Sequence, residues 1–347
     1  MELTKHIGID LGTANTVISC RGKGVVLQEP SVVAVHSKSG MVLAVGNSAK
    51  KMIGKTPEDV IAVQPIQNGV IADFDAAQAM LRAFVEQACP GGVFRPQVTV
   101  CVPFGVTEVE KRAVLEAVSR SGGKNTFVME SPMAAAFGAE LPIDEATGSM
   151  VLDIGGGIAE TVIVSFGGIV AGSCVRGAGS KMDADILEYI KETHGLFIGE
   201  RTAEEIKMTI GAVHSSCEEK QMRVMGRDVN SGLPKEIVIK TTDVREAIER
   251  TVQRILFSVQ TTLEKTPPEL VADIAERGIV LSGGGANLPG LDLRIRETTG
   301  ILARRVENAQ ECVALGATVA TSAFLENQIL RSGKRFFGQS VRGRAGA

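Results

Sequence analysis

The stretch Ile9-Asp10-Leu11-Gly12-Thr13-Ala14-Asn15-Thr16 decides the fold, because its pattern occurs a second time in the chain. A short apolar strand, Ile7 to Asp10, is followed by a glycine-bearing turn and by a returning strand, Thr16 to Cys20. The same order occurs at Leu152-Asp153-Ile154-Gly155, where a strand from Met150 to Ile154 precedes three glycines. A repeated supersecondary unit is typical of duplicated domains. The sequence therefore predicts two related α/β lobes.

The two glycine hairpins have a physical use if they face each other. Backbone N–H groups from both loops could then hold a polyphosphate from opposite sides, and Asp10 and Asp153 could hold a divalent cation through water. Neither loop matches the pattern GxxxxGK[ST], so a P-loop is excluded. A single hairpin of this kind would be better explained as a plain tight turn. The occurrence of two in matching positions favours phosphate binding.

A third glycine cluster lies between a strand and a helix. The strand Gly278 to Leu281 leads into Ser282-Gly283-Gly284-Gly285-Ala286-Asn287, and Leu291 to Thr298 has a helical pattern. Glycines at such a junction let a phosphate or a flat ring lie against bare backbone beside a helix N-terminus. The alternative is a flexible connector.

Composition excludes several classes of function. The chain has 347 residues, 37 Lys+Arg against 40 Asp+Glu, and 4% aromatic residues, which argues against a nucleic-acid partner. Its six cysteines are dispersed, so we expect buried free thiols in a reducing cytoplasm rather than disulfides or a zinc site. We see no signal peptide and no apolar run of about 18 residues, and we expect a soluble protein.

The three glycine motifs resemble those of the actin, Hsp70 and sugar-kinase superfamily, and within it those of the MreB family of bacterial actin homologues. The resemblance extends from about residue 5 to about residue 325. Other MreB-like stretches are Asn68–Phe74, Pro132–Ala136, Ile198–Glu204 and Glu264–Leu270.

The resemblance implies an α/β fold of duplicated actin-like (ribonuclease H-like) domains around a central nucleotide cleft, with four subdomains. Domain I would span residues 1–145, with an outer subdomain at about 32–74. Domain II would span residues 146–330, with an outer subdomain at about 181–243. Residues 331–347 would form a basic tail.

ATP and Mg²⁺ are the cofactors that the resemblance implies. Asp10 and Asp153 would orient the metal. The matching nucleotide contacts are Gly12, Thr13, Ala14 and Asn15 for the β- and γ-phosphates, Gly155, Gly156 and Gly157 closing over them, Glu204 and Lys207 for ribose and adenine, and Gly283, Gly284 and Gly285 for adenosine. From the residues alone, Glu204 and Lys207 would be an ordinary solvated ion pair one turn apart on a helix.

The chain departs from the family pattern where the attacking water is positioned. MreB proteins typically have Glu before the Pro-Met-Ala-Ala-Ala stretch, but here Ser131 stands there and Glu130 is displaced by one place. Their second phosphate motif typically continues Thr-Thr-Glu, but here it is Ile158-Ala159-Glu160. Loss of a base and of water-orienting hydroxyls costs on the order of a hundredfold or more in rate. We expect ATP to be bound and hydrolysed slowly or not at all; the alternative is an active ATPase that uses Glu130 or Glu160.

Membrane contact is expected at two places. The loop 90–96 carries Val93 and Phe94 between glycines and a cation, although the two side chains could instead pack against their own domain. The tail carries several Arg and Lys around Phe336 and Phe337, which would suit an anionic lipid surface, or it is a functionless end.

The resemblance implies a cytoskeletal protein that polymerises into membrane-associated filaments and helps determine cell shape by organising cell-wall synthesis. Its expected partners are further copies of itself, the inner membrane surface, and cell-wall synthesis and shape proteins. It would lie in the cytoplasm at the inner face of the cell membrane. A small-molecule kinase of the same superfamily and an Hsp70-like chaperone are the alternatives; the first usually needs substrate-binding insertions and the second a separate peptide-binding domain.

Overall fold

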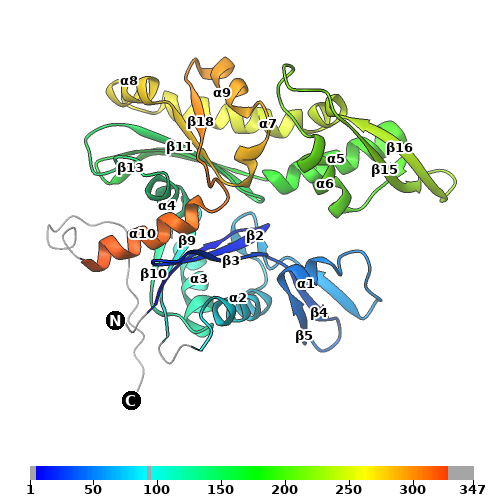
Figure 1. Cartoon of the computed structure of the whole chain (residues 1–347), viewed down its shortest axis with the longest axis horizontal. Helices are drawn as coiled ribbons and strands as arrows, with labels where there is room; N and C mark the ends of the chain where they lie inside the picture. Colours follow the sequence, from blue (N-terminus) through cyan, green and yellow to red (C-terminus); the bar gives the residue numbers. More distant parts are fainter. Residues whose placement is uncertain (1–4, 92–94, 327–347) are drawn as a thin grey trace.

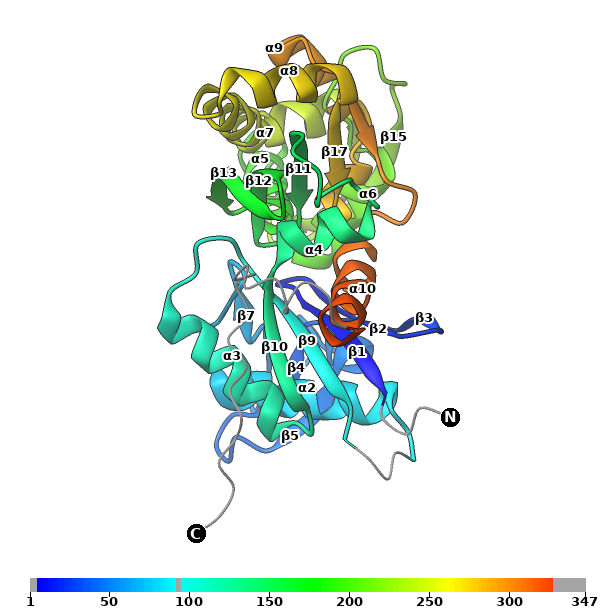
Figure 2. The same ribbon diagram turned by 90° about the vertical axis from the view of Figure 1, so that its left-hand side faces the viewer.

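Two lobes, each built on a five-stranded β-sheet, make up the molecule (Figure 1). The structure is a computed structural model and describes residues 5–91 and 95–326. In Figure 2 one lobe lies above the other, with helices α4 (Ser131–Gly138) and α10 (Cys312–Glu326) between them. The α/β class that the sequence predicts is confirmed.

The sheet of the N-terminal lobe has the strand order β10-β9-β1-β2-β3. Its strands are β1 (His6–Leu11), β2 (Asn15–Cys20), β3 (Gly24–Pro30), β9 (Gln97–Val102) and β10 (Lys124–Glu130). The first three form an antiparallel meander, whereas β9 runs parallel to both β1 and β10. Helices α2 (Phe74–Ala88) and α3 (Glu108–Arg120) share one hydrophobic core with Ile7, Ile9 and Ile18 of the sheet.

Helices α2 and α3 begin where the sequence provides a cap. Asp73 accepts a hydrogen bond from the backbone N–H of Ala76 (3.0 Å) at the start of α2. Thr107 and Glu110 form a reciprocal capping box at the start of α3. These side chains satisfy backbone donors that the first helical turn leaves unpaired. The sequence therefore fixes the residues at which α2 and α3 begin.

The sheet of the C-terminal lobe has the order β13-β12-β11-β17-β18, which matches the first sheet strand for strand. Its strands are β11 (Ser149–Ile154), β12 (Ile158–Ser165), β13 (Gly168–Arg176), β17 (Ile279–Ser282) and β18 (Ala303–Arg305). The meander β11-β12-β13 is again antiparallel, and β17 runs parallel to β11 and β18. Asp10 lies opposite Val17, and Asp153 lies opposite Glu160, at equivalent places of the two hairpins. The predicted duplication is confirmed.

Six helical segments complete the C-terminal lobe. They are α5 (Gly179–His194), α6 (Glu200–Ile210), α7 (Thr241–Glu264), α8 (Pro268–Arg277), the 3₁₀ turn η1 (Gly284–Asn287) and α9 (Leu291–Thr299). Apolar residues of α5, α6, α7 and α9 share one core with β11 and β12. The helix expected to carry Glu204 and Lys207 is α6, and the helix predicted from Leu291 is α9.

Each lobe also carries a small outer sheet. In the N-terminal lobe it consists of β4 (Val33–His36), β5 (Val42–Val45) and β6 (Val60–Val63), beside α1 (Gly46–Lys50) and the hairpin β7 (Ile66–Gln67) and β8 (Val70–Ile71). In the C-terminal lobe it consists of β14 (Leu196–Phe197), β15 (Gln221–Asp228) and β16 (Pro234–Lys240). All these strands fall within the expected outer segments, 32–74 and 181–243, whose boundaries stay predictions.

Helices α4 and α10 join the lobes. They pack against each other, α10 also contacts β1 and β9, and α4 also contacts β11 and β12 (Figure 2). Ser19 of β2 donates a hydrogen bond to the carbonyl of Ala314 (2.6 Å), and the hydroxyls of Thr99 and Thr321 are hydrogen-bonded to each other. The C-terminal helix thereby completes the N-terminal lobe.

The expectations about cysteines hold in part. All six cysteines are free, and Cys20, Cys101 and Cys312 are buried. The expectation of burial is wrong for Cys174, which lies on β13 and is exposed. Within residues 5–91 and 95–326, no helix has the length and apolar character needed to cross a bilayer.

Candidate functional site

The two glycine hairpins face each other between the lobes. A Cβ on Gly156 would lie 2.6 Å from the Cβ of Ala14, and one on Gly157 would overlap the Thr13 hydroxyl. Only residues without a side chain allow the hairpins to approach this closely. The Thr13 hydroxyl also accepts a hydrogen bond from the backbone N–H of Gly69 (2.9 Å). The geometry on which the phosphate-binding hypothesis depends is therefore present.

A cleft of about 590 Å³ opens above the hairpins. The adenosine loop, which we define as residues 283–290, forms a third wall, because β17 ends beside β11 and η1 follows it. The predicted nucleotide and metal residues all line this cleft, namely Asp10, Gly12, Thr13, Ala14, Asn15, Asp153, Gly155, Gly156, Gly157, Glu204, Lys207, Gly283, Gly284 and Gly285. Segments far apart in the sequence thus converge on one space.

Three carboxyl groups meet at the floor of the cleft. Burial, and then the charge of Asp153, raise the pKa of the Asp10 carboxyl to about 7. Burial also raises the pKa of Asp153, although a hydrogen bond from the Ser282 hydroxyl to its Oδ1 (2.6 Å) opposes the rise. The pKa of Glu160 lies well above its ordinary value, because the group is buried and lies close to Asp153. Acids crowded in this way are stabilised by a cation.

Glu160 is the most enclosed of these acids. It has no exposed surface, and its Oε1 accepts a hydrogen bond from the backbone N–H of Phe104 (2.5 Å). Its Oε2 is buried and has no hydrogen-bond partner among the described residues. A buried carboxylate oxygen without a partner is costly unless a ligand or water satisfies it.

The acids fit Mg²⁺ chemistry, since this ion prefers carboxylate oxygens and keeps several waters. Among the residues that the structure describes, no group of three or more His, Cys, Asp or Glu is arranged to hold a metal directly. Asp10 and Asp153 would hold such an ion together with water, which stays a prediction.

Glu204 and Lys207 do not pair with each other. Glu204 Oε2 lies 2.6 Å from Nζ of Lys50, which is the last residue of α1 in the opposite lobe. Lys207 Nζ lies 2.7 Å from Asp183 Oδ1 and donates a hydrogen bond to the carbonyl of Gly179 (2.8 Å). The interpretation as an ordinary pair along one helix is wrong, because α6 faces both α1 and α5. The Lys50–Glu204 pair connects α1 of one lobe with α6 of the other across the cleft.

The residues expected around the attacking water are dispersed. Ser131 lines the cleft, but its hydroxyl donates to the carbonyl of Val102 (3.1 Å). Glu130 does not line the cleft; its carboxylate accepts a hydrogen bond from the backbone N–H of Gly105, and burial raises its pKa. Ala159 also lies away from the cleft, in the hydrophobic core of its lobe. Successive side chains of a strand point to opposite faces, so Glu160 lines the cleft and Ala159 does not.

The sequence did not identify three residues that hold the site together. Lys50 and Asp183 bind the predicted nucleotide contacts of α6, and Ser282 binds Asp153. Only Ser282 had a signal, since it opens the adenosine motif. The membrane candidates Val93 and Phe94 and the tail 331–347 lie outside the described residues.

Known proteins resemble this chain along almost all of its length. The family model of the MreB/Mbl protein matches residues 4–328. The cell shape-determining protein Mbl of Bacillus subtilis is 45% identical over 316 residues, which cover 91% of this chain and 95% of Mbl. The crystal structure of MreB5 of Spiroplasma citri bound to AMPPNP is 33% identical, with a TM-score of 0.88 and coverage of 96% of this chain and 100% of that one.

A more distant likeness concerns the fold alone. The structure of the MamK double helical filament is 22% identical and has a TM-score of 0.80, with coverage of 92% of this chain and 99% of that chain. Together with the duplicated sheets and the glycine-lined cleft, the family match decides the assignment. The chain belongs to the MreB/Mbl protein family.

Proposed function

We propose that this protein binds ATP with Mg²⁺ in the cleft between its lobes. One observation carries the proposal: two glycine hairpins and the adenosine loop converge on one space whose floor holds Asp10 and Asp153. The S. citri relative is described as bound to AMPPNP, an analogue of ATP, and its fold superposes on this one over nearly the whole chain.

Different residues of the chain would bind different parts of the nucleotide. Backbone N–H groups of residues 12–15 and 155–157 would bind the phosphates, since such loops offer several donors to one anion. Asp10 and Asp153 would hold Mg²⁺ through water, and the cation would neutralise charge on the phosphates. Glu204 and Lys207 would contact ribose and adenine, with Oε1 of Glu204 on the ribose while its Oε2 keeps the pair with Lys50.

The protein would act as an actin-like cytoskeletal filament that takes part in determining cell shape. Its relative Mbl carries the description "cell shape-determining protein", and MamK was solved as a double helical filament. Assembly from identical subunits by head-to-tail contacts gives an open filament. Attachment to the inner face of the cell membrane through Val93 and Phe94, and contacts with cell-wall synthesis proteins, complete the proposal.

We propose that ATP hydrolysis is weak. The hydroxyl of Ser131 is no base near neutral pH, and it is already engaged with a backbone carbonyl. Glu160 supports the alternative of an active ATPase, because its buried Oε2 lacks a partner among the described residues and lies at the cleft floor. A phosphate-release assay decides: turnover equal to that of an MreB protein with both motifs intact contradicts weak hydrolysis.

Binding and assembly are tested separately. Calorimetric titration with ATP and Mg²⁺ should show one site, and Asp153→Asn should weaken ATP binding in the presence of Mg²⁺ more than ATP binding in EDTA.

Sedimentation with and without ATP should show polymer if the protein forms filaments. The alternative hypotheses, a small-molecule kinase or a chaperone, predict no sedimentable polymer. Liposome co-sedimentation of the variant with Val93 and Phe94 both changed to Ser, compared with the unchanged chain, tests membrane contact. Equal binding of the two contradicts the role of the loop.

A further inference from the structure

The nucleoside end of the cleft lies between two walls that belong to different elements. One wall is α6, which contributes Glu204, Lys207 and Met208. The other is the adenosine loop, which contributes its glycines together with Leu288 and Pro289. A ring inserted between these walls would contact both of them. Its fit therefore depends on how far apart α6 and the adenosine loop are held.

A short segment connects the walls. We define it as residues 211–217; it directly follows α6 and lies against the end of the adenosine loop. The backbone N–H of Val213 donates to the carbonyl of Pro289 (2.9 Å). Gly290 has φ +81°, and a Cβ there would lie 2.5 Å from the Cβ of His214 and 2.8 Å from the Sγ of Cys217. The segment and the adenosine loop therefore approach so closely that residue 290 has no room for a side chain, and its positive φ also favours glycine.

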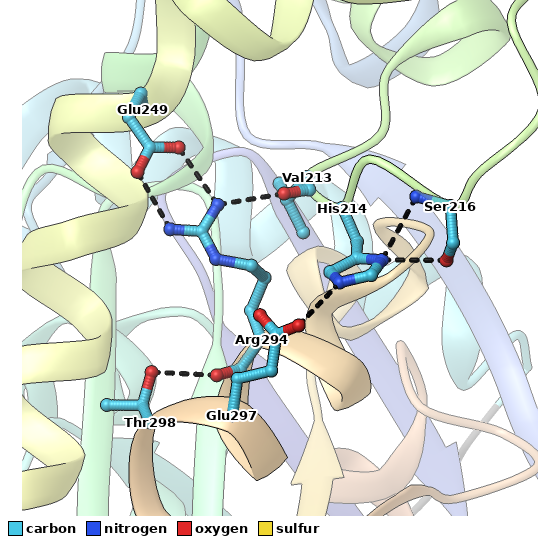
Figure 3. Close-up of polar contacts among 7 residues, drawn as sticks. All are labelled: Val213, His214, Ser216, Glu249, Arg294, Glu297 and Thr298. Carbon is cyan, nitrogen blue, oxygen red and sulfur yellow. Dashed lines mark hydrogen bonds and ion pairs between the residues drawn. The ribbon is translucent and has the colours of Figure 1, made fainter.

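Arg294, one turn into α9, fixes this segment from the other side (Figure 3). Its Nη1 donates to the carbonyl of Val213 (2.8 Å) and to Glu249 Oε2 (2.9 Å), and its Nη2 donates to Glu249 Oε1 (2.7 Å). The guanidinium thus binds a carboxylate of α7 with both of its terminal nitrogens while it holds the segment's carbonyl. The Arg294 side chain is 15% exposed and the Glu249 side chain 40% exposed, so the bonds are shielded from water on the Arg294 side.

His214 makes a second attachment to the same helix (Figure 3). The backbone N–H of Ser216 donates to its Nδ1 (3.1 Å), so Nδ1 is the acceptor and the ring proton lies on Nε2. Nε2 donates to Glu297 Oε1 (2.8 Å), one helical turn beyond Arg294. Two successive residues of the segment are therefore attached to α9. The carbonyl of Val213 binds Arg294, and the ring of His214 binds Glu297.

We propose that Arg294, supported by the His214–Glu297 contact, is a positioning residue that sets the distance between α6 and the adenosine loop and so the preference of the cleft for a purine base. This inference rests on the proposed nucleotide site. None of the clamp residues, which we define as His214, Glu249, Arg294 and Glu297, lines the cleft, so they act through the walls that they hold. The phosphate hairpins do not include any of these residues.

The test measures base preference rather than binding alone. We would titrate the full-length protein with ATP, CTP and inorganic tripolyphosphate, each with Mg²⁺, before and after Arg294→Met. Loss of hydrogen bonds made by a charged group should lower ATP affinity about tenfold. Tripolyphosphate affinity should stay within about twofold, because the hairpins are untouched, and the ratio of ATP to CTP affinity should fall. Glu297→Ala breaks the weaker attachment at an exposed carboxylate and should show the same pattern, about two- to threefold.

Two further variants separate positioning from stability. Arg296→Met changes an exposed arginine on the same helix and should leave all three affinities unchanged. The exchange Arg294→Glu with Glu249→Arg restores opposite charges between α7 and α9 but cannot donate from residue 294 to the Val213 carbonyl. We expect it to recover thermal stability and not base preference.

The results that overturn the inference are distinct from failure of the proposed function. If the unchanged protein binds no ATP, the proposed function fails and the inference falls with it. If the unchanged protein binds ATP but Arg294→Met and Glu297→Ala keep its ATP to CTP ratio, positioning is refuted. Equal losses for ATP and tripolyphosphate would also refute it, since they would show a general loss of folded protein.

Discussion

Replacing Lys50 by methionine should make bound nucleotide leave the cleft faster. Nζ of Lys50 and Oε2 of Glu204 are 2.6 Å apart, and the pair connects α1 and α6 of opposite lobes. Their side chains are 32% and 29% exposed, so the pair is partly screened by water and contributes on the order of 1 kcal/mol. Methionine keeps most of the side-chain length and removes only the charge. The closed form of the cleft should then be disfavoured about fivefold relative to the open form.

The assay is displacement of a fluorescent ATP analogue by excess ATP in a stopped-flow instrument. We expect dissociation about fivefold faster for Lys50→Met at low salt, and a smaller difference near 1 M salt, where the Debye length is about 3 Å. A double-mutant cycle with Glu204→Gln isolates the pair, because Glu204 is itself a proposed nucleotide contact. If Lys50→Met accelerates release equally in the Glu204→Gln background, the pair does not hold the cleft closed.

Further predictions concern the floor of the cleft. Ser131→Glu puts a carboxylate back at a position that lines the cleft, and phosphate release should rise tenfold or more; no rise would show that this position does not limit hydrolysis. Glu160→Gln keeps an oxygen that can accept from the N–H of Phe104 and should abolish any residual release if Glu160 is the base. The raised pKa of Asp10 favours its protonated form in the folded state, so its contribution to stability is present below about pH 4 and is lost as pH rises through about 7. Urea unfolding in EDTA at pH 5 and 7.5 should show this loss, and Asp10→Asn should reduce it, leaving the parts due to the raised pKa values of Asp153 and Glu160.

The hairpins and the sheet duplication could be predicted because their signal is local. A strand that ends in Asp before a glycine turn is visible within about ten residues, and it occurs twice. Strand periodicity could also have placed Ala159, since a residue next to a cleft-facing Glu160 in a strand must point to the other side of the sheet. The expectation for Ala159 came from the family motif alone, which does not show to which face of the sheet a side chain points.

Contacts between elements could not be predicted in this way. Lys50 and Glu204 belong to different lobes, and nothing near Lys50 in the sequence indicates a partner on α6. Arg294 and Glu249 likewise lie on separate helices, and their pairing depends on how α9 packs against α7. Such pairs follow from tertiary packing, whereas helical spacing suggested a pair of Glu204 with Lys207 that the fold does not make.

The position of α10 has a consequence for how the protein is made. The sheet of the N-terminal lobe emerges first from the ribosome, yet the hydroxyls of Ser19 and Thr99 on that sheet find their partners on α10, near the end of the described chain. Until α10 is synthesised, one face of this sheet lacks its cover, and its buried polar groups lack their bonds. The lobe that is translated first is therefore completed last. A nascent chain that pauses before residue 312 should need a chaperone to keep that face from aggregating.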